Sequence, residues 1–289
     1  MKISIVIPNY NTWDLVKRNI DSLYKYDRDN FHEIIVVDDC SPKARPDDFF
    51  PIVKVIRNSS NLHYTKTVNA GLRAAHGDII ILLDSDAYLV MPICTEIKKA
   101  YSTDEQLACL GFDTVDDIGN RIDNFLYEPS WRSFLSGQQL HKLIKPILSY
   151  KGKKEYPFSC AVSFRKSAIE ELGFFDESFP VLEADHDLSR RIHQHVFWKL
   201  AYTKSIFVYH VGGGSIPRNA DRVLKFYQYR WQYLGKHNIL PFRNLIKVLV
   251  SLRVLVELVL LYILSLFKKE MSYKVKGRVS LYRLISSLK

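Results

Sequence analysis

Two carboxylates separated by one residue follow an apolar run of the sequence. Asp84 and Asp86 flank Ser85, directly after Ile79–Leu83. Two carboxylates on one side of a strand end repel each other unless a cation lies between them. Mg²⁺ or Mn²⁺, which prefer oxygen ligands, would relieve the repulsion and bind a diphosphate as well. The alternative is a solvated aspartate turn, but the position after a buried strand favours the metal site.

Polar residues also follow two earlier apolar runs. Pro8-Asn9-Tyr10-Asn11 comes after Ile3–Ile7, and Asp38-Asp39 comes after Ile34–Val37. Ligands of parallel α/β sheets bind at the carboxyl ends of the strands. These positions therefore predict one ligand site, built from several strand ends.

The elements that must position this site alternate along the first hundred residues. The pattern predicts strands over 3–7, 34–37, 53–56 and 79–83, and helices over 14–24 and 65–75. Strands that are apolar on both faces and separated by helices indicate a parallel α/β sheet covered on both sides. The sequence has neither a G-x-G-x-x-G motif after the first strand nor a P-loop, and Gly212-Gly213-Gly214 lacks the P-loop lysine. A metal and basic groups must then hold any phosphate.

Composition limits the class of protein. The 289 residues, 47% hydrophobic and 25% charged, suffice for one large core or for two lobes that share one. The four cysteines show neither disulfide nor zinc spacing, which indicates a reducing compartment. The start of the sequence has no signal-peptide pattern, so we expect a cytoplasmic protein.

The positive charge is concentrated in the last part of the chain. The net charge is +10 overall. Residues 222–289 carry 14 Lys and Arg against two acids, a net +12, and the other residues carry 27 against 29, a net −2. This asymmetry suits nucleic acid or anionic lipid. Nucleic-acid binding predicts basic residues among exposed aromatic ones on the core fold, whereas here they lie beside aliphatic runs, so we predict no nucleic-acid partner.

The aliphatic runs of this tail predict membrane association. The longest run, from Leu258 to Phe267, is too short for a span of roughly 20 residues, and Arg253 and Glu257 precede it. We therefore expect the tail to lie in the interface of an anionic membrane. A second pattern, with apolar residues at 281, 284, 285 and 288, predicts a basic amphipathic helix. The alternative is packing on the protein's own core or on a second subunit of a homo-oligomer.

Several ordered motifs over residues 3–215 resemble those of the family 2 glycosyltransferases, which have the GT-A fold, a mixed and mostly parallel Rossmann-like sheet flanked by helices. The motifs are Ser4-Ile5-Val6-Ile7-Pro8-Asn9-Tyr10-Asn11, Val36-Val37-Asp38-Asp39-Cys40-Ser41, Asn69-Ala70-Gly71, residues 77–86, Gly173-Phe174-Phe175-Asp176-Glu177, Ala184-Asp185-His186-Asp187-Leu188 and His210-Val211-Gly212-Gly213-Gly214-Ser215.

The resemblance implies roles for residues of the first motifs. Pro8 and Tyr10 would frame the nucleotide base, and Asp39 would accept a hydrogen bond from it. Asn69 would belong to the same nucleotide-sugar-binding set. For Tyr10 the alternative is a core aromatic residue.

The resemblance also implies a metal site. Asp84 and Asp86 would hold Mn²⁺ or Mg²⁺ and the ribose, and His210 would complete the metal or diphosphate environment, because neutral imidazole is a good ligand and imidazolium a good phosphate partner. For His210, which follows the apolar run 206–209, the alternative is a buried, hydrogen-bonded histidine.

Asp185 is the candidate general base. The alternative is that Asp185 or Asp187 caps the helix that follows. The sequence departs from the family pattern at two places. The usual Glu-Asp pair appears as Ala184-Asp185 with Glu183 displaced by one residue, so Glu183 is a second candidate, and His63 stands where the family commonly has glycine.

Together these residues predict an inverting, metal-dependent glycosyltransferase on the inner face of the cell membrane. The expected donor is a nucleotide-diphosphate sugar, with UDP or dTDP favoured, and the expected acceptor is a glycan or lipid-linked hydroxyl in surface polysaccharide synthesis. A non-catalytic scaffold with the same fold and a nucleotidyltransferase are the alternatives. The latter requires a glycine-rich basic loop, which residues 9–13 do not supply.

The chain is expected to divide into a donor half, 1–112, an acceptor and catalytic half, 113–221, and the tail, 222–289. Residues 113–157 contain aromatic side chains that suit sugar stacking and lysines that suit a lipid-linked diphosphate. These residues are Phe125, Tyr127, Trp131, Phe134 and Lys151-Gly152-Lys153-Lys154.

Overall fold

The structure is a computed structural model and describes residues 1–46, 49–144, 154–210, 220–267 and 272–288. The chain forms two compact units. The first consists of Met1–Glu128 and Lys154–Pro217, and the second of Pro129–Lys153 and Arg218–Lys289. The second unit therefore joins the predicted tail to a segment from the middle of the chain.

The strands are β1 Ile3–Asn9, β2 Glu33–Asp38, β3 Lys54–Arg57, β4 Ile79–Leu83, β5 Tyr88–Leu89, β6 Leu107–Val115, β7 Arg121–Ile122, β8 Phe125–Tyr127, β9 Glu155–Pro157, β10 Ala161–Arg165 and β11 Lys199–Tyr209. The helices are α1 Trp13–Asp27, α2 His63–Ala74, α3 Cys94–Thr103, α4 Trp131–Ile144, α5 Lys166–Leu172, α6 Ala184–Gln194, α7 Ala220–Lys236, α8 Arg243–Phe267 and α9 Ser272–Ser287.

The main sheet of the first unit is mixed, with strand order β3-β2-β1-β4-β10-β6-β11-β5. The first four strands in this order pair in parallel, as the early part of the sequence predicts. Strand β10 then pairs antiparallel with both β4 and β6. The parallel pairing expected of the early strands is thus confirmed for β1 to β4, and the sheet as a whole is mixed, as predicted for the GT-A class.

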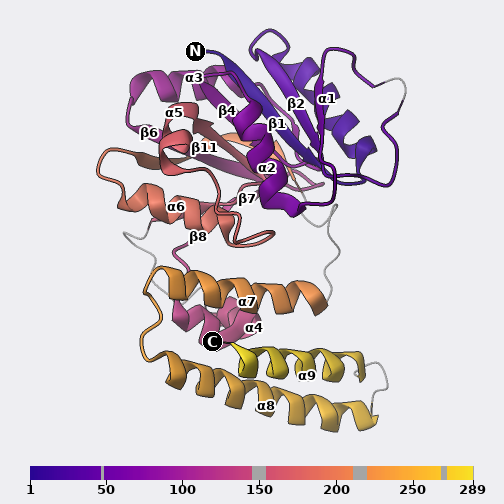
Figure 1. Cartoon of the computed structure of the whole chain (residues 1–289), viewed down its shortest axis with the longest axis vertical. Coiled ribbons are helices and arrows are strands. Elements are labelled where there is room, and N and C mark those ends of the chain that lie inside the picture. Colours follow the sequence, from indigo (N-terminus) through magenta and orange to yellow (C-terminus); the bar gives the residue numbers. More distant parts are fainter. Residues whose placement is uncertain (47–48, 145–153, 211–219, 268–271, 289) are drawn as a thin grey trace. The chain divides into compact units, whose positions relative to one another are not determined.

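Helices cover both faces of this sheet (Figure 1). Successive residues of a strand point to opposite faces. Ile5 and Ile7 of β1 belong to a core that also contains Trp13 of α1 and residues of α3. Val6 points to the other face, where Gly71 of α2 lies so close that a Cβ there would meet the Val6 side chain at 2.4 Å. Glycine at position 71 therefore lets α2 pack tightly against β1.

The strand register brings the predicted polar strand ends to one edge of the sheet. Asn9 at the end of β1 pairs with Asp38 at the end of β2, and Val6 pairs with Leu82 near the end of β4. Because these strands are parallel, the residues after β1, β2 and β4 emerge at the same edge.

The second unit consists of helices α4, α7, α8 and α9, which contact one another. Its buried aromatic residues include Phe134 and Trp231, whose ring centroids are 5.5 Å apart. Helices α8 and α9 lie side by side (Figure 1). Leu281 and Ile285 of α9 are almost completely buried. The apolar pattern at 281, 284, 285 and 288 therefore packs on the protein's own helices, which was the alternative to membrane binding.

The apolar part of the tail is longer than the sequence analysis expected. Helix α8 is continuous over 25 residues and is long and apolar enough to cross a membrane, by length and composition alone. The expectation that the apolar part of the tail is too short to span a membrane is therefore wrong about its length. The helix continues through Arg253 and Glu257, which are good helix formers and form an i,i+4 ion pair at 3.3 Å.

Candidate active site

Asp38 and Asp39 differ in what they contact. The Asp38 carboxylate accepts hydrogen bonds from Asn9 Nδ2 at 3.0 Å and from Ser41, and pairs with Arg57. Asp38 thus ties together the ends of β1, β2 and β3. Asp39 Oδ1 accepts bonds from the Leu62 amide and from Asn58, each at 2.8 Å.

Two residues expected near the nucleotide base lie on β1 and directly after it. Pro8 is buried within the strand and pairs with Val37 of β2. Tyr10 is 49% exposed, so the alternative that it is a core aromatic residue is wrong. Its ring is available to a ligand at this edge of the sheet.

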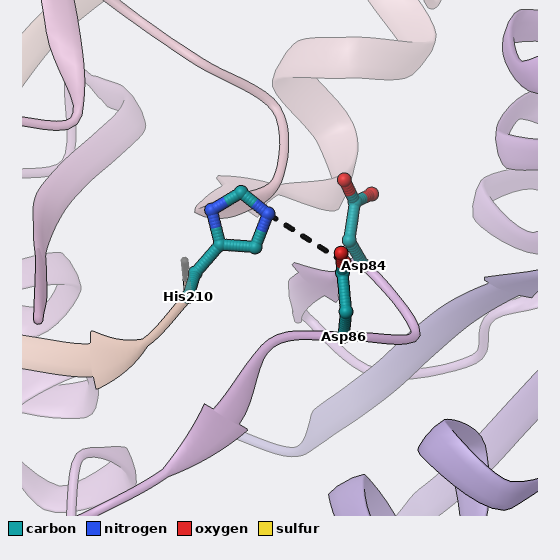
Figure 2. Close-up of side chains that lie close together, drawn as sticks. All are labelled: Asp84, Asp86 and His210. Atoms are coloured by element: carbon teal, nitrogen blue, oxygen red, sulfur yellow. Dashed lines mark ion pairs between the residues drawn. The ribbon is translucent and has the colours of Figure 1, made fainter. Parts of the chain in front are cut away.

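The structure brings Asp84, Asp86 and His210 together. One ligand atom from each lies within 4.8 Å of the others. Figure 2 shows the His210 ring directed at Asp86, with Asp84 beside it, and His210 Nε2 is 3.5 Å from Asp86 Oδ1. The two aspartates leave β4 and His210 follows β11, so residues more than 120 positions apart form one cluster.

This cluster has strongly perturbed electrostatics. Burial, followed by the charge of Asp86, raises the pKa of Asp84 to about 6, although His210 and the Tyr64 hydroxyl oppose the shift. Burial alone would lower the pKa of His210. Hydrogen bonds with Asp86 and Cys160 and the charge of Asp84 outweigh burial and raise that pKa to about 11. His210 is therefore an imidazolium near neutral pH when no cation is bound.

Asp185 lies at the start of α6, close enough to the cluster for its charge to contribute to the raised pKa of Asp84. Its Oδ1 accepts a hydrogen bond from the His186 amide at 2.9 Å, and its Oδ2 accepts one from the Ser159 amide at 3.4 Å. Asp187 is instead fully buried and pairs with Arg191 at 2.8 Å. The two aspartates thus have different surroundings, and Asp185 is the one near the cluster.

Glu183, the second candidate base, is also buried. Its Oε2 lies 3.3 Å from His186 Nδ1, and its backbone has a φ of +75° at the N-cap of α6. The displaced glutamate therefore contacts His186 within its own helix.

Asn69 and His63 lie on α2. Asn69 is completely buried and bonds through its amide to the backbone nitrogen and oxygen of Phe175, so it joins α2 to the segment after α5. His63 has a φ of +67°, in the left-handed region that favours glycine. This conformation gives a physical reason for the glycine that the resembled family commonly has there.

Parts of the predicted acceptor region are also placed. Phe125 and Tyr127 lie on β8 and are half-buried, whereas Phe134 is fully buried. Lys154 donates to the His193 carbonyl at 3.2 Å. Residues 151–153 and 211–215 of the predicted motifs lie outside the described residues.

The family model for Glycosyl transferase family 2 matches residues 4–173, more than half of the chain. The chain belongs to this family. The resemblance of its motifs to those of the family 2 glycosyltransferases is thereby confirmed.

Curated relatives match parts of this glycosyltransferase. An uncharacterized glycosyltransferase of Haemophilus influenzae is 28% identical over 44% of the chain and 38% of its own length. TarS of Staphylococcus aureus, a poly(ribitol-phosphate) β-N-acetylglucosaminyltransferase, is 34% identical over 31% of the chain and 17% of its own length. The matches thus span well under two thirds of these relatives.

Solved structures share the fold. The mannosyltransferase PcManGT from Pyrobaculum calidifontis is similar with a TM-score of 0.57 at 14% identity, over 99% of this chain and 86% of the other. S. aureus TarS 1-349 in complex with UDP is similar with a TM-score of 0.51 at 17% identity, over 87% of this chain and 70% of the other. These likenesses confirm the GT-A fold of this family 2 glycosyltransferase.

Three site residues of the glycosyltransferase were not found by sequence reasoning. The Tyr64 hydroxyl lies 2.8 Å from Asp84 Oδ1 and 3.1 Å from Ser159 Oγ. Because the Ser159 amide donates to Asp185, these contacts connect Asp84 to the candidate base. The Cys160 carbonyl accepts from the Asp84 amide at 2.9 Å. No local signal marks these residues. The antiparallel pairing of β10 with β4 brings Ser159 and Cys160 to the site, and Tyr64 comes from the start of α2.

The raised pKa of Asp84 predicts that its charge destabilises the metal-free protein. A carboxyl group whose pKa rises on folding stabilises the fold fully only below its unfolded pKa, and this contribution is lost as the pH rises through about 6. Asp84→Asn should therefore raise the free energy of unfolding by about 1–3 kcal/mol at pH 8, and by roughly half as much at pH 5, which lies between the unfolded pKa and the folded pKa of about 6. Denaturant unfolding in EDTA at both pH values measures the effect. A variant less stable than the wild type at pH 8 would contradict this interpretation.

Proposed function

We propose that this protein transfers a sugar from a nucleotide-diphosphate donor to a hydroxyl group of an acceptor, with inversion at the anomeric carbon and dependence on Mn²⁺ or Mg²⁺. The observation that carries the proposal is the convergence of Asp84, Asp86 and His210 at one sheet edge, with Asp185 within electrostatic reach. A scaffold has no need to keep this costly cluster of charges.

The residues of the cluster fit a divalent cation. Carboxylates are suitable ligands for Mn²⁺ and Mg²⁺, and neutral imidazole is a common metal ligand in proteins. The raised pKa of Asp84 indicates that its charge is incompletely compensated by the protein. Asp84, Asp86 and His210 would hold the ion. When bound, the ion would supply Lewis-acid stabilisation of the negative charge on the departing nucleotide diphosphate.

The donor nucleotide would lie beside β1 and β2. Exposed Tyr10, together with Pro8, would frame the base, and Asp39 would accept a hydrogen bond from it. The described bonds of Asp39 use Oδ1 and orient its carboxylate. Asp84 and Asp86 would also contact the ribose. Asn69, being fully buried, would support this donor site through α2 and not by direct contact.

Asp185 would act as the general base. A sugar acceptor hydroxyl must lose its proton as its oxygen attacks the anomeric carbon, and a positioned carboxylate typically contributes about 10²–10⁴-fold to such a step. The amides of Ser159 and His186 hold the Asp185 carboxylate in place. Attack from the face opposite the leaving group inverts the anomeric centre, and no nucleophile from the protein is required.

The relatives support a place in surface polysaccharide synthesis. TarS acts on poly(ribitol-phosphate), and a Myxococcus xanthus relative is an O-antigen biosynthesis protein. One solved neighbour contains UDP and another GDP-Man with Mn²⁺. We propose a UDP- or dTDP-sugar donor and a glycan or lipid-linked acceptor. Residues 1–112 would bind the donor and 113–221 the acceptor, with the protein on the inner face of the cell membrane through residues 222–289.

The raised pKa of His210 predicts that metal binding releases a proton. His210 is protonated near neutral pH in the metal-free protein, and imidazole must lose its proton to become a ligand. Binding of Mn²⁺ at pH 7.5 should therefore release about one proton. Titration calorimetry in buffers of different ionisation enthalpy measures this number. Metal binding without proton release would mean that His210 is not a ligand and remains a cation for the diphosphate.

The proposed function is tested by a donor screen. UDP-, dTDP- and GDP-sugars with Mn²⁺ or Mg²⁺ are assayed for release of nucleotide diphosphate, and the product of the active donor is examined by NMR. We expect one nucleotide to be turned over and the anomeric configuration to be inverted. A retained configuration would exclude this mechanism. Absence of both turnover and metal-dependent nucleotide binding would favour the scaffold.

A further inference from the structure

Helix α8 exposes a continuous apolar face along its length. From Leu245 to Phe267 every exposed residue is apolar, with exposed fractions between 39% and 81%. They are Leu245, Val248, Leu249, Leu252, Val256, Val259, Leu260, Tyr262, Ile263, Leu264, Leu266 and Phe267. Such a large contiguous apolar surface marks an interaction site.

The opposite face of α8 packs on the protein itself. Ile246, Val250 and Val254 follow one another at intervals of four residues and are buried, which places them on one side of the helix. At 100° per residue, Leu252 and Val256 lie on the other side. Helix α8 thus has one face for its own unit and one for a partner.

All the charged side chains within 245–267 contact neighbouring helices. Arg253 donates to the Leu135 carbonyl of α4 at 2.6 Å and to the Tyr227 hydroxyl of α7 at 2.7 Å. Glu257 pairs with Arg253 and with Arg278 of α9, at 2.6 Å from the latter. Lys247 donates to the Leu288 carbonyl after α9. The charges that interrupt the apolar sequence are therefore directed into the second unit and away from the exposed face.

Position 137 is adapted to this arrangement. Gly137 has a φ of +73°, and a Cβ there would lie 2.4 Å from a guanidinium nitrogen of Arg253. Glycine lets α4 bend around the arginine and present its carbonyl groups to it.

We infer that α8 lies flat in the surface of an anionic membrane, with its exposed face against the acyl chains, and does not cross the bilayer. The inference rests on the proposed membrane location and deepens it by naming the element that binds. A crossing α8 would have to take α9 with it or break the Glu257–Arg278 ion pair and the Lys247–Leu288 hydrogen bond. Helix α9 carries the exposed residues Lys274, Lys276 and Arg283. Charged groups in the bilayer core are strongly unfavourable.

Charge identifies the partner as anionic lipid. Residues 222–289 carry a net +12, and basic groups near a membrane surface are attracted to anionic headgroups. An apolar face combined with a basic remainder is typical of helices that lie in the plane of the interface. The buried stripe of α9 leaves α8 as the inserting element.

The first experiment measures vesicle binding by the full chain. We compare wild type with Leu252→Glu/Val256→Glu in flotation with phosphatidylglycerol-containing vesicles. The matched control is Ile118→Glu/Val196→Glu, which changes two exposed apolar residues of the first unit. We expect the α8 variant to lose more than about tenfold in binding and the control to bind like wild type. Equal binding by all three proteins, or no binding by wild type, would overturn the inference.

The second experiment distinguishes lying flat from crossing. A fluorophore is attached to cysteine introduced at Leu245, Val256 or Leu266 in a Cys40→Ser background, and its depth is measured with lipid-borne quenchers. A flat helix places all three labels at a similar depth of about 5–10 Å. A label at 256 near the bilayer centre with the other two shallow would show a crossing helix and overturn the inference.

The outcome is separable from that of the proposed function. Nucleotide diphosphate release is measured on the same α8 variant with a soluble acceptor. Retained turnover with lost vesicle binding supports both proposals, and turnover in wild type without vesicle binding overturns only the membrane inference. A wild-type dimer that dissociates in the variant, with no vesicle binding, would assign the face to a second copy of the chain.

Discussion

Asp86→Asn is expected to lower metal-dependent sugar transfer by about 10²–10³-fold or more. The substitution keeps the size of the side chain and removes the charge that contacts His210 at 3.5 Å. Both the proposed metal site and the pairing of His210 then lose a carboxylate. Release of nucleotide diphosphate over a range of Mn²⁺ concentrations measures the effect. If the loss arises at the metal, excess Mn²⁺ should restore part of the turnover.

The control for Asp86→Asn is Asp21→Asn on the exposed surface of α1. It removes the same charge from the first unit and should leave turnover and Mn²⁺ dependence unchanged. Wild-type turnover by Asp86→Asn at limiting Mn²⁺ would contradict the assignment of Asp86 to the metal site.

Asp185→Asn is expected to lower transfer to the acceptor by about 10²–10⁴-fold while donor binding and stability change little. Asparagine has a single acceptor oxygen and can keep only one of the hydrogen bonds that the Ser159 and His186 amides donate to the two carboxylate oxygens. Its side chain cannot take the proton of the acceptor hydroxyl. Transfer kinetics and titration of the donor with Mn²⁺ separate the two effects. A variant that binds the donor normally and transfers at the wild-type rate would exclude Asp185 as the base.

Asp187→Asn provides the matched control on the same helix. Asp187 is fully buried and pairs with Arg191, so the loss of its charge leaves a partly buried guanidinium with a weaker partner. We expect this variant to lose stability in denaturant unfolding, by about 1–3 kcal/mol. Substitution of Asp185 should thus affect mainly catalysis, and substitution of Asp187 mainly stability.

The first strands and the acidic positions could be predicted from sequence because the signals are local. Apolar β-branched runs such as Ile79–Leu83 identify buried strands, and Asp84 and Asp86 follow directly. Parallel pairing then brings β1, β2 and β4 to one edge. That edge could be deduced before any coordinate was available.

Other features depend on contacts between distant segments. The antiparallel insertion of β10 between β4 and β6 carries Ser159 and Cys160 to the site, and nothing near these residues in sequence predicts it. In the same way, the hydrogen bonds of Arg253 to α4 and α7 direct its charge into the second unit and leave the exposed face of α8 apolar. A count of uninterrupted apolar residues could not detect this compensation.

The central claim is that Asp84, Asp86 and His210 hold a divalent cation required for sugar transfer. The most direct test is donor turnover by wild-type protein depleted of metal with EDTA, before and after addition of Mn²⁺ or Mg²⁺. We predict turnover near the background rate before addition and recovery after it. At the same limiting metal concentration, Asp86→Asn should show little recovery. Full turnover in EDTA would contradict the claim. It would mean that His210 and other groups of the protein stabilise the charge of the diphosphate without a metal ion.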